Sequence, residues 1–138
     1  MVPKGFVEGL IHFYAGNKER AYTALDAARW ILEMEAKENR GDLMAHFHVA
    51  IAYAAMGWKE AALAEVARAK VKPDGLYLAA LFAHAGERDA ALRVLEQIPA
   101  ELKQYYYDLR LGPHWDPLRG NPRFEKIVEE SRKPVAIK

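Results

Sequence analysis

Five histidines are the side chains of this chain best suited to binding a metal or transferring a proton. His46 and His48 are two positions apart, so on a helix they point to different sides and cannot share a metal as an i, i+4 pair could. His12, His84 and His114 have no carboxylate partner at a recognised ligand spacing. Cysteine is absent, which removes thiolate nucleophiles, disulfides and cysteine-type zinc sites together. We therefore expect no metal and no cofactor.

The sequence also lacks the motifs of common enzymes. It has no glycine-rich phosphate loop, no H-E-x-x-H and no nucleophile elbow, and beyond its tyrosines only Thr23 and Ser131 carry a hydroxyl group. Tyr105, Tyr106 and Tyr107 spread over most of a helix circumference, and we expect two of these rings in the core and one half exposed. The sequence predicts a protein that is not an enzyme.

The composition is that of one domain without a strongly charged partner. The 138 residues include 20 Lys and Arg and 19 Asp and Glu, so the charges nearly cancel. No long basic block appears, which argues against a nucleic-acid partner. The opening MVPKGFVEGLIHFYAG lacks the apolar run and cleavage site of a signal peptide, and no stretch reaches about 18 apolar residues. We expect a single domain over residues 1–138, cytoplasmic and with no membrane partner.

Three segments share one spacing, Gly-x4-Ala-x3-apolar-x2-small or apolar. Gly can take the left-handed conformation that ends a helix, and an Ala five residues later lets two helix backbones approach closely. An apolar stretch with helical period precedes each glycine, so each unit is predicted to be helix, turn, helix. The residues that fit the spacing are Gly16, Ala21, Leu25 and Ala28; Gly57, Ala62, Val66 and Ala69; and Gly86, Ala91, Leu95 and Ile98.

The predicted hairpins cover about residues 3–40, 42–72 and 74–98, and a capping segment covers 99–133. Asp42 and Asp74 are expected to cap the first helices of the second and third hairpins. The second helix of the first hairpin is expected to be long, and the helices of the third hairpin are expected to be short.

This spacing resembles that of the tetratricopeptide repeat family, whose units are helix-turn-helix with small residues at the crossing. Tyr53, four residues before Gly57, and Pro73, after the second unit, also match. The glycine spacing departs from the family period of about 34 residues, and His46 and Gly75 stand where the family has a Trp. The resemblance implies an all-α fold, a short array of antiparallel helical hairpins in a right-handed superhelix.

The segment WDPLRGNPRF, from Trp115 to Phe124, carries a second resemblance. It is similar to the W/F-D-P-L-R-x-D/N-P-R-F signature that follows tetratricopeptide arrays in many large bacterial regulators, with Asn121 where the family usually has Asp. That similarity implies homology to the tail of a longer regulatory protein, but no activity.

The closing segment is expected to cover the open end of the array. Pro99 is predicted to start a helix that Gly112 and Pro113 end, Asp116 to cap a single turn that Gly120 stops, and Asn121 with Pro122 to start a last helix. We expect Trp115, Leu118 and Phe124 to cover the last hairpin. Arg119 and Arg123 are expected to pair with Asp108, Asp116 or nearby carbonyls.

The tetratricopeptide resemblance implies that the first helix of each hairpin lines a concave groove. Chaperone-binding members of the family hold a terminal carboxylate there with Lys, Asn and Arg, but the corresponding positions here are Phe6, Leu10, His48, Pro73 and Tyr77, so that clamp is absent. The side chains placed in the groove are nearly all apolar: Phe6, Leu10, Phe13 and Tyr14; Met44, Phe47, Ile51 and Ala54; and Leu76, Ala80, Ala83 and His84.

A continuous apolar groove usually marks an interface. We therefore predict a noncatalytic protein–protein interaction module that binds a partner helix, a peptide or a second copy of itself through the groove, unless its own C-terminal helices cover it. The alternative is a small-molecule-binding protein or an enzyme that uses His48, His84 and Tyr53 at the groove mouth. Glu33, Glu35 and Glu38, with Lys37 and Arg40, are expected to form a solvated face of the long helix.

Overall fold

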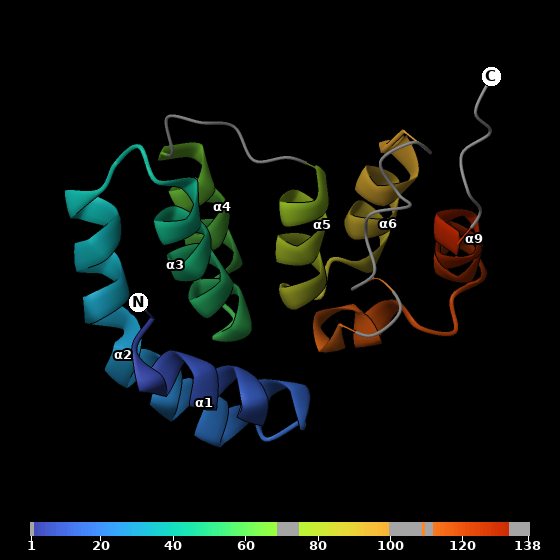
Figure 1. Ribbon diagram of the computed structural model, residues 1–138. Helices are drawn as coiled ribbons and strands as arrows, with labels where there is room; N and C mark the ends of the chain where they lie inside the picture. The colour runs from blue at the N-terminus through green and yellow to red at the C-terminus, as the bar shows by residue number, and fades with distance from the viewer. Residues whose placement is uncertain (1, 69–74, 100–108, 110–111, 133–138) are drawn as a thin grey trace. The chain divides into compact units, whose positions relative to one another are not determined.

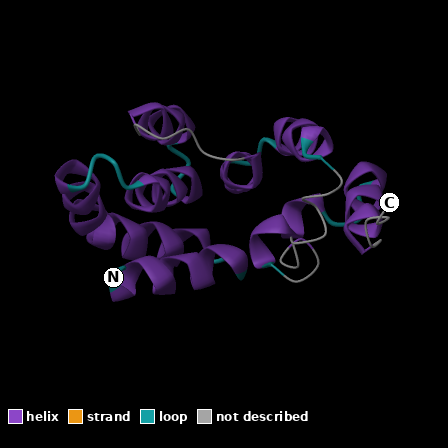
Figure 2. Cartoon of the chain, turned by 45° about the horizontal axis from the view of Figure 1, so that its top comes forward, coloured by secondary structure: helices purple, strands orange, loops and turns teal. Residues whose placement is uncertain are grey.

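The computed structural model describes residues 2–68, 75–99, 109 and 112–132, and in this part of the chain every regular element is a helix (Figures 1 and 2). The predicted all-α fold is therefore confirmed, whereas the superhelix stays a prediction. The chain divides into two compact units, Met1–Pro73 and Asp74–Lys138. The sequence predicted one domain over 1–138; we describe each unit by itself.

Unit 1 consists of two helical hairpins. Helix α1 (Lys4–Tyr14) packs against α2 (Lys18–Glu38), and α3 (Leu43–Ala55) packs against α4 (Lys59–Arg68) (Figure 1). Packing of α2 on α3 joins the two hairpins. As predicted, α2 is the longest of these helices, with 21 residues.

Unit 2 contains one further hairpin and the closing segment. Helices α5 (Gly75–His84) and α6 (Arg88–Gln97) form the hairpin and are short, as expected. A 3-10 helix, η1 (Pro113–Leu118), contacts α5 and α6, and α9 (Pro122–Arg132) contacts α6.

The three turn glycines have the conformation that the sequence predicts. Gly16, Gly57 and Gly86 have φ values of 84°, 88° and 78°, in the left-handed region that favours glycine. In each turn the following residue donates its N–H to a carbonyl near the end of the preceding helix, as Asn17 does to His12 (2.8 Å) and Trp58 to Tyr53 (2.8 Å). The first helix of each hairpin therefore ends in the same way, at a glycine with positive φ followed by a hydrogen bond back to the helix.

Small residues bring the helices of each hairpin together. Ala21, Ala62 and Ala91 are fully buried, as their spacing from the turn glycines predicts. Gly9 adds a close approach that the spacing does not reveal, because a Cβ there would lie 2.5 Å from Cγ of Leu25. The fully buried Leu25 thus packs directly on the backbone of α1, and burying a leucine of this kind contributes about 2 kcal/mol.

The second hairpin departs from the predicted spacing. Nine residues after the turn glycine, Leu25 and Leu95 are buried, but Val66 is only half-buried. Glu65, one position earlier, takes the buried position in α4, with 6% of its surface exposed. The expected apolar seam of this hairpin therefore contains a carboxylate, whose partners are described below.

The closing segment covers the third hairpin with apolar side chains, as predicted. Trp115 and Phe124 are fully buried, their ring centroids lie 6.4 Å apart, and Leu118 is 1% exposed. Asn121 accepts a hydrogen bond from the N–H of Arg123 (2.9 Å), so it caps α9 as expected, with Pro122 at the first helical position.

Two details of the closing segment differ from expectation. The 3-10 helix begins at Pro113 rather than after Asp116, so Asp116 does not cap it. Asp116 accepts a hydrogen bond from Arg119 (2.9 Å), a pair that the sequence predicted. Arg119 also donates to the carbonyls of Leu109 and Gly112, as predicted. Arg123 instead reaches α6, where it binds Asp89 (2.7 Å) and Glu96 (2.6 Å), because α9 lies against that helix.

Several predictions fall outside the described residues. These are the cap at Asp74, the residues Pro73, Ala69 and Asp108, most of the helix expected after Pro99, and the three consecutive tyrosines.

Candidate functional site

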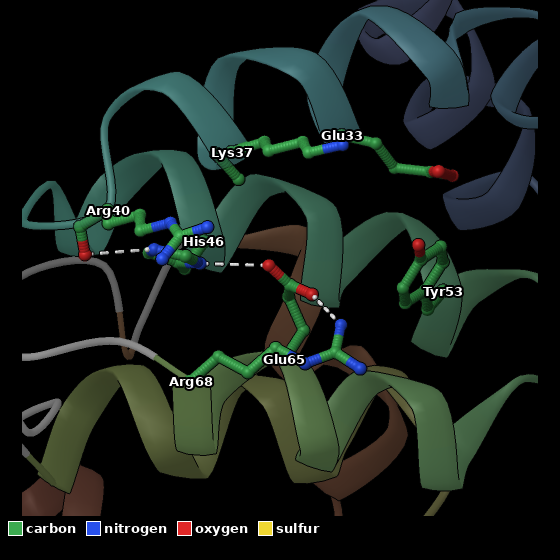
Figure 3. A pocket seen from close by; sticks show the side chains of 8 residues that line it. Glu33, Lys37, Arg40, His46, Tyr53, Glu65 and Arg68 are labelled. Atoms are coloured by element: carbon green, nitrogen blue, oxygen red, sulfur yellow. Dashed lines mark hydrogen bonds and ion pairs between the residues drawn. The ribbon is translucent and has the colours of Figure 1, made fainter.

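A pocket of about 520 Å³ lies within unit 1 (Figure 3). Helix α2 supplies one side, α4 the opposite side, and α3 the side chains between them, with Arg40 coming from the loop that joins α2 to α3. The lining residues are Glu33, Ala36, Lys37, Arg40, His46, Tyr53, Glu65 and Arg68.

His46 is the most enclosed polar side chain of the pocket, with 4% of its surface exposed. Its Nδ1 lies 2.8 Å from Oε1 of Glu65 and its Nε2 lies 3.1 Å from the carbonyl oxygen of Arg40. A carbonyl oxygen only accepts, and a carboxylate oxygen also accepts, so both hydrogen bonds are made when both ring nitrogens carry a proton. His46 therefore ties α3 to α4 and to the loop before α3.

Glu65 is held from two sides. Oε1 faces His46, and Oε2 accepts from Nη1 of Arg68 at 3.0 Å, one turn further along α4. A carboxylate that is 8% exposed in its side chain is costly to bury unless it is paired and hydrogen-bonded. Each of its oxygens has a hydrogen-bond partner, and Arg68 supplies a positive charge, which explains how a Glu can replace an apolar residue in this hairpin.

Tyr53 and Glu33 form the other end of the pocket (Figure 3). Burial raises the pKa of the Tyr53 hydroxyl to about 12, with further contributions from the charge of Glu33 and from its hydrogen bond. Glu33 also accepts from Arg29 at 2.7 Å. The guanidinium of Arg29 in turn lies 5.3 Å from the ring centroid of Trp58, which contacts the Tyr53 ring at 5.5 Å. Glu33 is therefore a paired group, rather than part of a solvated face as expected.

Lys37 and Arg40 differ from the other charged groups of the pocket. Both are exposed, and among the described residues neither has a carboxylate within ion-pair distance. The carboxylates of the pocket, in contrast, are each bound to cationic donors. The pocket therefore has positive charge available for a ligand.

The chemistry open to this pocket is binding more than proton transfer. Both nitrogens of His46 are occupied, and the raised pKa of Tyr53 makes its hydroxyl a poor acid near neutral pH. Among the described residues, no three His, Asp or Glu side chains gather closely enough to hold a metal ion.

The residues predicted to line the apolar groove have unequal exposure. Met44 is 39% exposed, whereas Phe6, Ile51 and His84 are buried and present almost no surface. Ala54, Ala80 and Ala83 are buried as well. The remaining five are half-buried: Leu10, Phe13, Tyr14, Phe47 and Leu76. Leu76, Ala80, Ala83 and His84 belong to unit 2 and the others to unit 1, so the groove as a whole stays a prediction.

The three residues named for the alternative function lie in different surroundings. Tyr53 lines the pocket, but His48 lies against the ring of Phe6, with centroids 5.4 Å apart. Burial lowers the pKa of His48. Nδ1 of His84 is 2.7 Å from the carbonyl oxygen of Ala80, so this ring donates to its own helix. Of the three, only Tyr53 belongs to the pocket.

Sequence reasoning missed His46, Glu65 and Arg68 as a group. Ala62 and Glu65 are three positions apart, so they share a face of α4, and the glycine spacing assigns Ala62 to the buried side. That spacing was the signal available. Sequence reasoning also missed two exposed apolar residues of α2, Trp30 (59% exposed) and Met34 (49%), which are spaced i, i+4 on the face opposite Leu25 and Leu32.

Comparison with known proteins found no match to this chain among family models, curated proteins or solved structures. In the described part of the chain, no helix has both the length and the apolar character needed to cross a bilayer.

Proposed function

We propose that this chain is a noncatalytic protein–protein interaction module of the tetratricopeptide type, which binds a partner helix, a peptide or a second copy of itself through apolar side chains. The observation that carries the proposal is the exposure of Trp30 and Met34, side by side on α2. Tryptophan is enriched among the residues that dominate binding energies at interfaces. A large apolar pair left in water is the feature of unit 1 that a partner would cover.

Other exposed apolar residues of unit 1 support the same function. Val7 (46%) and Ile11 (60%) form a second i, i+4 pair on α1, and Met44, a member of the predicted groove, is 39% exposed on α3. Scattered apolar residues on a surface need no explanation, but pairs on successive turns of one helix form a contiguous stripe. The proposed interaction surface therefore has candidate stripes on both helices of the first hairpin.

Light scattering over a concentration series, with native mass spectrometry, is the experiment that tests this proposal. A dimer that Trp30→Glu converts to a monomer would support binding of a second copy. With a monomer, the next step is a library of amphipathic helical peptides, and a peptide that binds the parent protein but not Trp30→Glu would support a partner helix. Tyr22→Glu, also exposed on α2 but away from the pair, is the matched control.

A protein that stays monomeric and binds no library peptide in a Trp30-dependent manner would contradict the proposal. Ile11→Glu is the corresponding probe for the exposed apolar pair on α1. If neither dimerisation nor peptide binding depends on Ile11, the pair on α1 is not part of the interaction surface.

The alternative function, a small-molecule-binding protein or enzyme, is favoured by one observation, the pocket that Tyr53 lines. The volume of about 520 Å³ lies within the range of small-molecule sites, about 300 to 1,000 Å³. A ligand that copurifies with the protein in native mass spectrometry would support this alternative.

A further inference from the structure

The charges that line the pocket of unit 1 are unequally paired. Glu65 is bound by His46 (2.8 Å) and Arg68 (3.0 Å), and Glu33 is bound by Arg29 (2.7 Å). These carboxylates are therefore largely compensated before any ligand arrives. A cationic ligand would have to compete with donors that already hold them.

Lys37 and Arg40 are in the opposite situation. Both line the pocket, both are exposed, and no described carboxylate lies within ion-pair distance of either. Their three-donor ammonium and five-donor guanidinium groups are suited to an oxyanion, which Arg binds with two parallel hydrogen bonds. The charge that remains unmatched in this pocket is thus positive.

The rest of the lining favours an organic body over a bare ion. The Tyr53 ring and the methyl group of Ala36 line the pocket, and the volume of about 520 Å³ exceeds what an inorganic oxyanion needs. Aromatic and aliphatic walls with a few convergent polar groups are typical of small-molecule sites.

We propose that the pocket of unit 1 binds a small organic anion, a carboxylate or a phosphate monoester with a compact apolar or aromatic body. Lys37 and Arg40 hold the oxyanion, and the Tyr53 ring packs against the body. This site goes beyond the proposed interaction function. Trp30 is not among the lining residues, so a test of the pocket gives no information on binding through Trp30.

Isothermal titration calorimetry at fixed ionic strength tests the proposal with four probes of one shape. Benzoate and phenyl phosphate carry the two oxyanions, benzamide is neutral and benzamidine is a cation. The expected result is binding of at least one anion with a Kd of about 1 mM or tighter, and benzamide and benzamidine at least about tenfold weaker. Preference between benzoate and phenyl phosphate separates a carboxylate ligand from a phosphate ligand.

A pair of double variants locates the binding. Lys37→Ala with Arg40→Ala is expected to weaken the anion at least about tenfold. Lys18→Ala with Arg20→Ala removes the same charge from exposed positions at the start of α2, outside the pocket, and is expected to change Kd less than about twofold. Circular dichroism checks that helix content is kept, and Lys37→Gln alone replaces the first double variant if that variant loses helix.

Two outcomes would overturn the proposal. One is anion binding no tighter than that of benzamide. The other is equal weakening by both double variants, since that would mean that the anion responds to net charge rather than to this pocket.

Discussion

The helices of the α3–α4 hairpin and those of the C-terminal segment are held together by opposite kinds of contact. In the first, Glu65 is buried in the seam and is matched by His46 and Arg68. In the second, Trp115 and Phe124 fill the interior, and the charged groups lie outside. Closure by apolar packing requires only fitting shapes, whereas closure by a buried ion pair also requires every partner to be in place.

The ion pairs that arginine makes in the closing segment are exposed to solvent, in contrast with the buried pair of Glu65. Arg123 bridges α9 to α6 through Asp89 and Glu96, but its side chain is 41% exposed. Its guanidinium lowers the pKa of Asp89, whose side chain is 66% exposed. Such pairs position a helix and contribute little stability. We therefore expect a graded series of effects when these groups are removed.

The largest effect is expected from Trp115→Ala. Removing a fully buried indole should lower the free energy of unfolding by about 3 to 5 kcal/mol, because it leaves a cavity beside Phe124. Urea denaturation followed by circular dichroism measures the loss. Trp30→Ala deletes the same side chain from a position that is 59% exposed and should cost less than about 1 kcal/mol. Equal losses would mean that the closing segment is not packed as described.

The next effect concerns the buried pair. Glu65→Ala should cost about 3 kcal/mol, because His46 then keeps a buried donor without an acceptor. The double variant His46→Phe with Glu65→Met should recover most of that loss, since it removes both polar partners and keeps the volume. Urea midpoints of the parent, single and double variants form the test. A double variant as unstable as Glu65→Ala would mean that the polar pair itself is needed to hold α3 against α4.

A smaller effect is expected from Arg123→Ala. The variant should unfold at a lower urea concentration than the parent, and the difference should shrink in about 1 M salt because the pairs are solvent-exposed. Arg93→Ala, which loses a pair within α6 alone, is the matched control and should lose less. A salt-independent loss would place the contribution of Arg123 in packing instead.

The smallest effect is a dependence on pH through His48. Burial lowers its pKa below the usual value of 6.5, so the unfolded chain binds this proton more readily than the folded one. Its contribution is complete above pH 6.5 and is lost as the pH falls through the folded pKa. The urea midpoint of the parent should therefore fall more between about pH 8 and about pH 5 than that of His48→Gln. Equal falls would show that His48 is protonated alike in both states.

The hairpins could be predicted because their signals are local. A glycine with positive φ, an alanine at the crossing and a cap such as Asp42, whose carboxylate accepts from Met44 at 2.9 Å, all act within a few residues. The apolar cover of the closing segment was predictable for a related reason, since Trp115 and Phe124 are large and flanked by Pro and Gly.

The pocket could not be predicted in the same way. Glu65 follows a run of alanines in a helix rich in charge, where a Glu is usually solvated. Its burial depends on His46, 19 residues earlier, and on a carbonyl in the loop before α3. Pairing of this kind depends on how two helices are rotated against each other, and a shift of one position, from Val66 to Glu65, changes the chemistry of the seam.

The turn glycines carry a consequence for chirality. A Cβ added at Gly16, Gly57 or Gly86 would meet no atom within 4 Å, so an L-residue there is opposed by its torsion angle and not by its neighbours. A D-residue prefers the mirror-image torsions and has no such conflict. D-alanine at any of these turns would therefore restrict the unfolded chain while leaving the hairpin unchanged. The three turns exclude L-residues by their backbone torsion angles and not by lack of space.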